Sequence, residues 1–131
     1  MSELRANTIS AANGTGPVTL TKQHAAKSWA SFDQTSTDHP VYDSFNVSGT
    51  SDEGAGATKI SFSNNMSNAN YSTSGGGQTD GFNATMFGVV GKRTTNGEQM
   101  TTADFHTNCR NTSGTDTDTA YVAFVVHGDL A

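Results

Sequence analysis

The chain has 131 residues, a formal net charge of −5, and charged side chains at only 15% of its positions. The seven Lys and Arg residues are scattered, so they form no basic face for nucleic acid, and the modest net charge argues against intrinsic disorder. A single Cys excludes an intramolecular disulfide and a cysteine-based zinc cage.

No run approaches the roughly 20 apolar residues of a spanning helix, so membrane insertion is not expected. The start has no basic segment followed by an apolar run, so we expect no signal peptide and synthesis in a cytoplasm. Hydrophobic residues make up 33% of a chain that is rich in Thr, Ser, Asn and Gly. Thr suits a half-buried pleated surface and the other three suit turns, so the composition predicts short strands joined by many turns.

The first 22 residues read as an extended arm with little core of its own. Its apolar residues stand apart in a polar strip broken by Asn-Gly and Gly-Pro turns; they are Leu4, Ile9, Val18 and Leu20. Such a segment frays unless something holds it. We therefore divide the chain into an N-terminal attachment arm, residues 1–22, and a single folded domain, residues 23–131.

Three later segments, 41–48, 58–62 and 102–110, alternate apolar with polar residues. This period of two predicts strands with one buried side and one solvent-facing side. The residues expected on the buried sides are Val41, Phe45, Val47, Ile60, Phe62, Ala103, Phe105 and Cys109.

Two segments, 82–90 and 121–126, are apolar on both sides. They are interpreted either as central strands of a sandwich or as strands covered by another subunit. Turn-forming clusters separate the strands at fairly regular intervals: 38–40, 49–57, 64–70, 75–77, 96–97 and 111–118. Together these signals predict an all-β fold, an antiparallel β-sandwich or jelly-roll-like domain that follows the extended N-terminal arm.

The sequence offers no convergent catalytic group. The four His residues (His24, His39, His106 and His127) form no metal-type pair, and Cys109 shares the parity of Phe105, which favours a buried, inert thiol over a nucleophile. Asp52 and Glu53 lie in one Gly-rich loop, and Asp116 and Asp118 in another. Neither matches a twelve-residue calcium loop, so solvated turns are favoured over calcium sites. We predict no catalytic, cofactor-binding or metal-binding residue.

Four polar aromatic residues could stack on sugar rings: Trp29, Tyr42, Tyr71 and Tyr121. The alternative is that these rings fill the core or a seam between subunits. For Trp29, which is close to Phe32 in the sequence, the sequence favours the core or the seam.

From Ala26 to Gly128 the chain resembles a β-rich domain found near the C-terminus of many tail-fibre and other virion proteins, especially of marine and cyanobacterial phages. The segments that carry the resemblance, in the same order, are Lys27–Phe32, Asp43–Ser48, Lys59–Phe62, Asn68–Tyr71 and Tyr121–Gly128. The opening Leu4–Ile9 is similar to a short N-terminal tag on such proteins. The stretch Asp33–His39 departs from the family, because it replaces a Gly-Thr-Gly turn with a longer polar loop.

The resemblance implies a structural protein of the virion, made in the host cytoplasm: a short tail fibre or tip module, expected to be a homotrimer. Residues 1–22 would attach to other virion proteins, and the β-domain would contact a host cell-surface glycan or protein. One alternative is a capsid decoration or head-fibre protein, and a second is a carbohydrate-binding, lectin-like module. No enzyme activity, cofactor or nucleic acid is expected.

Overall fold

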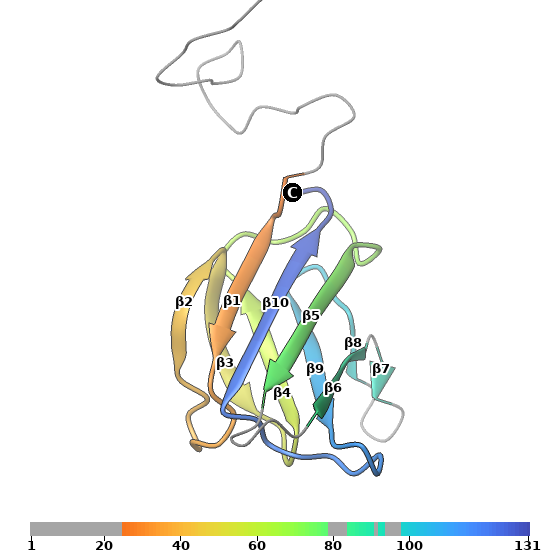
Figure 1. Ribbon diagram of the computed structural model, residues 1–131. Coiled ribbons are helices and arrows are strands. Elements are labelled where there is room, and N and C mark those ends of the chain that lie inside the picture. Colours follow the sequence, from red (N-terminus) through yellow and green to blue (C-terminus); the bar gives the residue numbers. More distant parts are fainter. Residues whose placement is uncertain (1–24, 79–83, 91, 94–97) are drawn as a thin grey trace, which may run out of the picture.

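The computed structural model describes residues 25–78, 84–90, 92–93 and 98–131, with side chains for residues 25–78 and 100–131. The predicted arm, residues 1–22, and His24 lie outside the described residues, so the division into arm and domain stays a prediction. Within the described ranges the chain forms ten β-strands and no helix, hence no helix that could cross a membrane (Figure 1).

The strands, in chain order, are β1 (Ser28–Phe32), β2 (Val41–Phe45), β3 (Val47–Asp52), β4 (Ala57–Phe62), β5 (Ser72–Gln78), β6 (Ala84–Val90), β7 (Lys92–Arg93), β8 (Glu98–Gln99), β9 (Asp104–Arg110) and β10 (Tyr121–His127). Eight of them follow the order β2-β1-β10-β5-β6-β9-β4-β3, and β7 pairs with β8. Every pairing is antiparallel.

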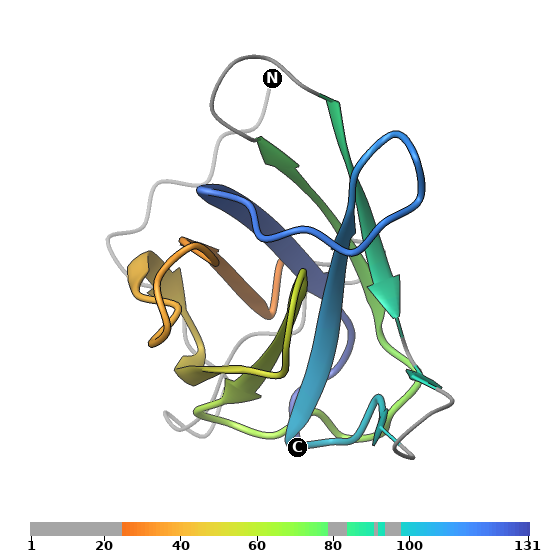
Figure 2. The ribbon, with the colours of Figure 1, turned by 90° about the horizontal axis from the view of Figure 1, so that it is seen from below.

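The strands pack as a sandwich of two layers. The front sheet of Figure 1 is β2-β1-β10-β5, and β9-β4-β3 form the other sheet. Strand β6 joins the two layers, because Ala84 and Thr85 pair with β5 whereas residues 86–90 pair with β9 (Figure 2). The all-β antiparallel sandwich predicted from the sequence is confirmed.

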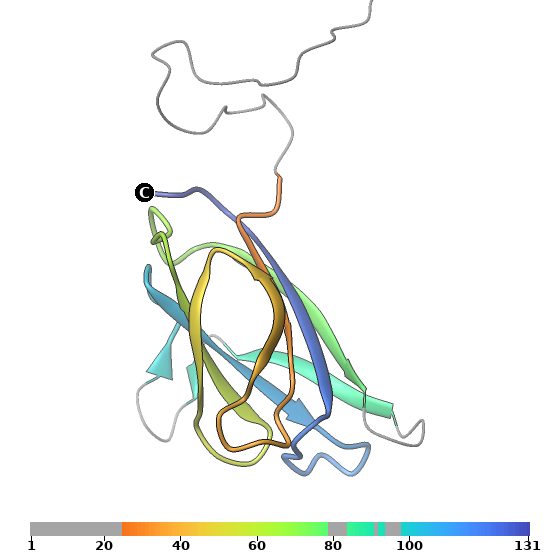
Figure 3. The ribbon, with the colours of Figure 1, turned by 90° about the vertical axis from the view of Figure 1, so that its left-hand side faces the viewer.

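The predicted strand 41–48 is two strands, one in each sheet. Asn46 has a φ of 56°, in the left-handed region that Asn tolerates better than most residues, and the chain turns there from β2 to β3 (Figure 3). Within β2, a β-bulge at Tyr42 changes the side of the residues that follow, because Val41 pairs with Phe32 whereas Asp43 pairs with Ser31. Val47 packs against the core, whereas Phe45 is half exposed on the outside of the front sheet.

Asn46 also fastens the corner. Its Nδ2 donates to the carbonyl oxygens of Lys27 at 2.9 Å and Asn64 at 3.1 Å, and its Oδ1 accepts from the Asn64 amide at 2.7 Å. One side chain thus ties the start of β1 to the segment that follows β4, which belong to different sheets.

The core lies between the sheets and is dominated by aromatic rings. The ring centroid of Phe105 lies 5.0 Å from that of Phe124 and 5.6 Å from that of Phe62. Tyr71 packs against Phe62 in the same cluster. The expected burial of Ile60, Phe62, Phe105 and Cys109 is confirmed. The prediction of a solvent-facing side for residues 102–110 is wrong in part. His106 and Asn108 are buried, because β9 lies inside its sheet between β4 and β6.

One expected turn, 75–77, is strand, and another, 49–57, is strand at its ends and a turn only at residues 53–56. The glycines at 75–77 lie in β5, paired with β10 on one side and, at Gly77, with β6 on the other, and Gly49 lies in β3. Pairing on both sides of β5 overrides the weak strand preference of Gly. The clusters at 38–40, 64–70 and 111–118 do connect strands, whereas 96–97 lie outside the described residues.

Strand β10 shows how one doubly apolar segment is used. Its inner side chains, Val122, Phe124 and Val126, are buried in the core. The outer ones, including Tyr121, face away from the core on a central strand of the front sheet. Strand β6 is the other doubly apolar segment, and its side chains lie outside those described.

Candidate functional site

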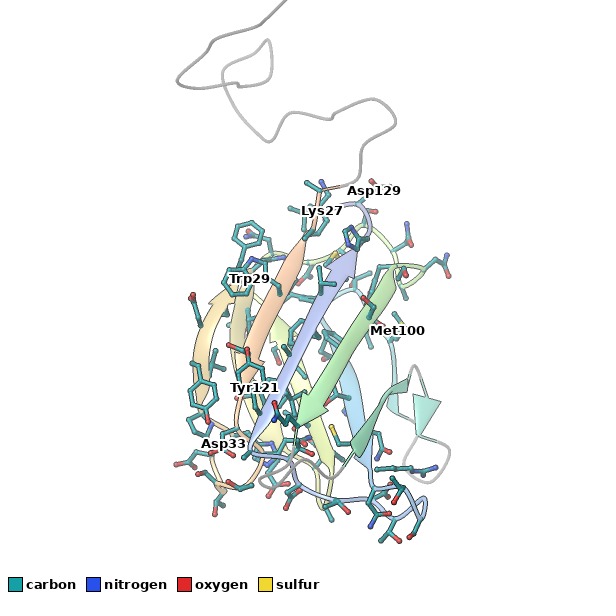
Figure 4. All side chains as sticks on the ribbon, viewed as in Figure 1. Lys27, Trp29, Asp33, Met100, Tyr121 and Asp129 are labelled. Atoms are coloured by element: carbon teal, nitrogen blue, oxygen red, sulfur yellow. The ribbon has the colours of Figure 1, made fainter. Side chains whose placement is uncertain are left out.

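The outer side of the front sheet carries four large exposed side chains, which we call the aromatic face: Trp29 on β1, Tyr42 and Phe45 on β2, and Tyr121 on β10. Their exposed fractions are 37%, 56%, 50% and 48%. Trp29 and Tyr121 both lie on the front sheet in Figure 4. At about 200 Å² per aromatic side chain, these fractions amount to roughly 400 Å² of exposed ring surface.

Of the two positions that the sequence favoured for Trp29, the core is therefore wrong, and the seam between subunits stays a prediction. Trp29 and Phe32 are three residues apart, and an odd separation places two side chains on opposite sides of a strand. Phe32 is fully buried and Trp29 faces outward. The core interpretation is right for Tyr71, which is 7% exposed, and wrong for Tyr42 and Tyr121.

The register of the strands sets the side chains in rows across this face. In the first row, Trp29 lies opposite Phe45 on β2 and opposite Val125 on β10. Val125 in turn lies opposite Ser74 on β5. The row is apolar over three strands and ends at a short polar side chain.

The second row contains only short side chains on its three inner strands. Ser31 lies opposite Ala123 on β10, and Ala123 lies opposite Gly76 on β5. We call these three residues the small-residue floor. Its outer neighbour on β2 is Asp43, whose carboxylate is exposed.

Beyond the floor, a pair of tyrosines closes the other end. The rings of Tyr42 and Tyr121 are stacked, with centroids 6.1 Å apart and planes at 13°. The Tyr42 hydroxyl donates to the carbonyl oxygen of Ala120 at 3.1 Å. Hydrogen bonds that the Thr35 side chain and backbone amide donate lower the pKa of Asp33, which lies beside this pair. The tyrosine pair is thus held in place before any partner arrives.

The floor continues into a shallow, open depression of about 340 Å³ over β5 and β10. Its lining residues are Ser74, Gly75, Gly76, Ala123, Phe124 and Val125. The space above Gly76 is open, because a Cβ at this position would meet no atom within 4 Å.

A second cluster, which begins at Gln34 next to Asp33, is polar and buried. Thr58 Oγ1 accepts from Gln34 Nε2 at 2.9 Å and lies 2.8 Å from His39 Nδ1, and His39 Nε2 lies 3.7 Å from an Asp52 oxygen. The connectivity is that of a hydroxyl–His–carboxylate triad. However, Thr58 is 0% exposed, so its hydroxyl cannot reach a substrate, and the cluster acts as a structural network.

Sequence reasoning missed the buried residues of this network. It placed Gln34 and His39 in a polar loop, and the structure buries both at 1% exposure. No sequence signal marks this arrangement, because a residue before proline is expected to be extended, whereas His39 has a φ of 42°.

The acidic loops use their carboxylates internally. Asp52 accepts from the Gly54 amide at 2.7 Å, Asp118 accepts from the Gly56 amide at 2.6 Å, and Asp116 pairs with Arg110. Among the described residues no three His, Cys, Asp or Glu side chains gather as a metal ion requires. These contacts favour the turn interpretation of the loops.

The remaining candidates also have plain positions. Cys109 is fully buried, and burial, partly offset by hydrogen bonds with Thr119 and Gln34, raises the pKa of its thiol to about 11. The inert-thiol interpretation agrees with that environment, since the thiolate is the reactive form. His127 is exposed at the end of β10.

Comparison with known proteins gives no match for this chain, whether against family models, curated proteins or solved structures. Function is therefore argued from the aromatic face itself.

Proposed function

We propose that this chain is a structural module of a bacteriophage virion, a short tail fibre or tip protein, that works by surface contact. Its front sheet presents the aromatic face to the host surface, and residues 1–22 attach the module to other virion proteins. The assignment to a phage rests on the resemblance of residues 26–128 to virion β-domains. The assignment of the contact surface rests on the aromatic face.

The aromatic face is the single observation that carries the proposal. Large exposed apolar patches on a soluble domain mark sites of interaction, and roughly 400 Å² lies in the range of the largest patch on a typical monomer. The four rings come from three strands and share one side of one sheet, so they form a surface and not scattered exposures. Aromatic residues are also those that dominate binding energy at interfaces.

The two parts of the proposal have separate tests. Immunogold labelling of purified particles, with an antibody raised against this chain, should mark the tail in a small number of copies per particle. Labelling spread over the head would replace the tail assignment with capsid decoration, and unlabelled particles would refute the virion assignment.

Contact is measured by cosedimentation of the labelled chain with host cells. The double variant Trp29→Ala/Tyr121→Ala should lose at least about tenfold in binding, since two interface rings are removed. Lys59→Ala is the matched control, because Lys59 has 37% side-chain exposure on the other sheet. Equal losses in both variants would show that the aromatic face is not the contact surface. Sedimentation equilibrium of the full chain tests the expected homotrimer.

A further inference from the structure

We propose that the small-residue floor, which lies between Trp29 and the tyrosine pair, is a binding site for a neutral oligosaccharide together with the shallow depression that it continues into over β5 and β10. We call the floor and this depression the groove. This inference rests on the proposed contact function and names the chemical class of its partner. It is carried by the spacing of the rings, their fixed positions, the size of the patch and the charges around it.

The spacing is set by strand geometry. Along β10, Tyr121 and Val125 are four residues apart, which is about 13 Å, and Trp29 lies beside Val125. The floor lies midway, at Ala123. Two aromatic surfaces are thus separated by a strip without bulky side chains, longer than one sugar ring, along which a chain of rings can lie (Figure 4).

The surface also offers what a pyranose needs chemically. Aromatic faces pack on the apolar C–H side of a sugar ring, while its hydroxyls seek polar partners at the rim. Ser31 and Ser74 supply hydroxyl groups, Gln78 an amide and Asp43 a carboxylate, all on the same side of the sheet as the rings. A purely apolar partner would offer these polar groups no hydrogen bonds.

The tyrosine pair is positioned in advance. Stacking at 6.1 Å and the 3.1 Å hydrogen bond to Ala120 hold Tyr42 against Tyr121. A site whose side chains are already ordered loses less conformational entropy on binding.

The size of the patch suits a smaller occupant than a second copy of this chain. A stable protein interface buries about 800 Å² on each partner with all atoms counted, so the roughly 400 Å² of ring surface would supply half of it and polar surroundings the rest. A short oligosaccharide matches the smaller area and the open groove beside it.

The charges select a neutral glycan. Asp33 and Asp43 both lie at the β2 side of the groove, and aspartates are negatively charged at neutral pH. The whole chain carries a net charge of −5. Uronic or sialic acids and phosphorylated sugars would be repelled from this side.

The chain contains its own reporter, because Trp29 is its one Trp. We would titrate the full-length protein with hexasaccharides of glucose, mannose, galactose and N-acetylglucosamine, and with polygalacturonate as the anionic comparison. At least one neutral oligosaccharide should change Trp29 emission saturably, and polygalacturonate should not. No change with any neutral sugar, or an equal response to polygalacturonate, overturns the proposal.

Matched glycine variants test the groove without removing a ring. Gly76→Leu fills the floor, and Gly49→Leu is the control on β3, since a Cβ at either position meets nothing within 4 Å. Gly76→Leu should weaken sugar binding at least about tenfold and Gly49→Leu by less than about twofold. Equal affinities would overturn the groove assignment.

The cell-binding assay separates failure of this inference from failure of the contact function. If no neutral sugar binds and Trp29→Ala/Tyr121→Ala still abolishes cell binding, the glycan class is wrong and the contact surface stands. If the double variant also leaves cell binding unchanged, both are wrong. If the variant instead dissociates an oligomer, the face is a subunit interface and the glycan proposal is overturned.

Discussion

Replacing Asn46 tests the physical account of the corner between the two sheets. Asn46→Ala removes three hydrogen bonds with backbone groups of Lys27 and Asn64, at 2.9, 3.1 and 2.7 Å. At about 1 kcal/mol each, the loss is about 3 kcal/mol. The φ of 56° adds about 1 kcal/mol for Ala, which avoids the left-handed region.

The expected destabilisation of Asn46→Ala is therefore about 4 kcal/mol, which for a domain of this size lowers Tm by about 15 °C. Urea unfolding followed by Trp29 fluorescence measures the free energy of unfolding. Asn46→Gly separates the two contributions, because Gly accepts the positive φ but makes none of the side-chain bonds; it should still lose about 3 kcal/mol.

Asn65→Ala is the control, since Asn65 is exposed and should change stability by less than about 0.5 kcal/mol. A near-native Asn46→Gly would refute the reasoning, because it would show that the corner depends on backbone conformation and not on the hydrogen bonds.

Three further outcomes follow from buried positions. Gly56→Ala, at a φ of 69° and with backbone atoms as close as 2.8 Å or less to the new Cβ, should lose more than about 3 kcal/mol in urea unfolding, and Gly54→Ala, in open space, about 1–2 kcal/mol. The Cys109 thiol, with a pKa of about 11, should resist iodoacetamide at pH 8 until the chain unfolds, and rapid labelling of the native protein would contradict that expectation. Because the pKa is raised from 9.0, the contribution of Cys109 to stability is full below pH 9 and falls as the pH rises toward 11. Thr58→Val should cost about 2–3 kcal/mol, because it leaves His39 Nδ1 and one of the two N–H groups of Gln34 Nε2 without a partner. Thr107→Val, which breaks one 3.4 Å bond, should cost less than about 1 kcal/mol, and similar values for the two would refute the network.

Period-two alternation predicted the strand at 58–62 and its buried side because both sides of that strand keep a constant environment. The same alternation failed at 41–48. A β-bulge at Tyr42 breaks the period, and the left-handed backbone at Asn46 then passes the chain to the other sheet. Phe45 is therefore exposed, whereas Val47 packs against the core. The local hydrophobic pattern predicts which side chains of a strand share a side, but it does not predict where the chain passes from one sheet to the other.

The glycines of β5 show a different limit. Gly is a poor strand former, and three in a row predict a turn. Hydrogen bonds from β10 along the whole strand, and from β6 at its end, hold 75–77 extended. Strands distant in the sequence therefore determine the conformation of 75–77, and this extended conformation also places Gly76 in the small-residue floor.

The sequence by itself determined that the chain is all-β and that Cys109 is buried, because alternation and composition are local properties of a chain. Only the tertiary structure decided that Trp29, Phe45 and Tyr121 share one surface. That surface exists because β1 pairs with β10 and β2 in one register, and a shift of a single residue would turn the rings to the other side.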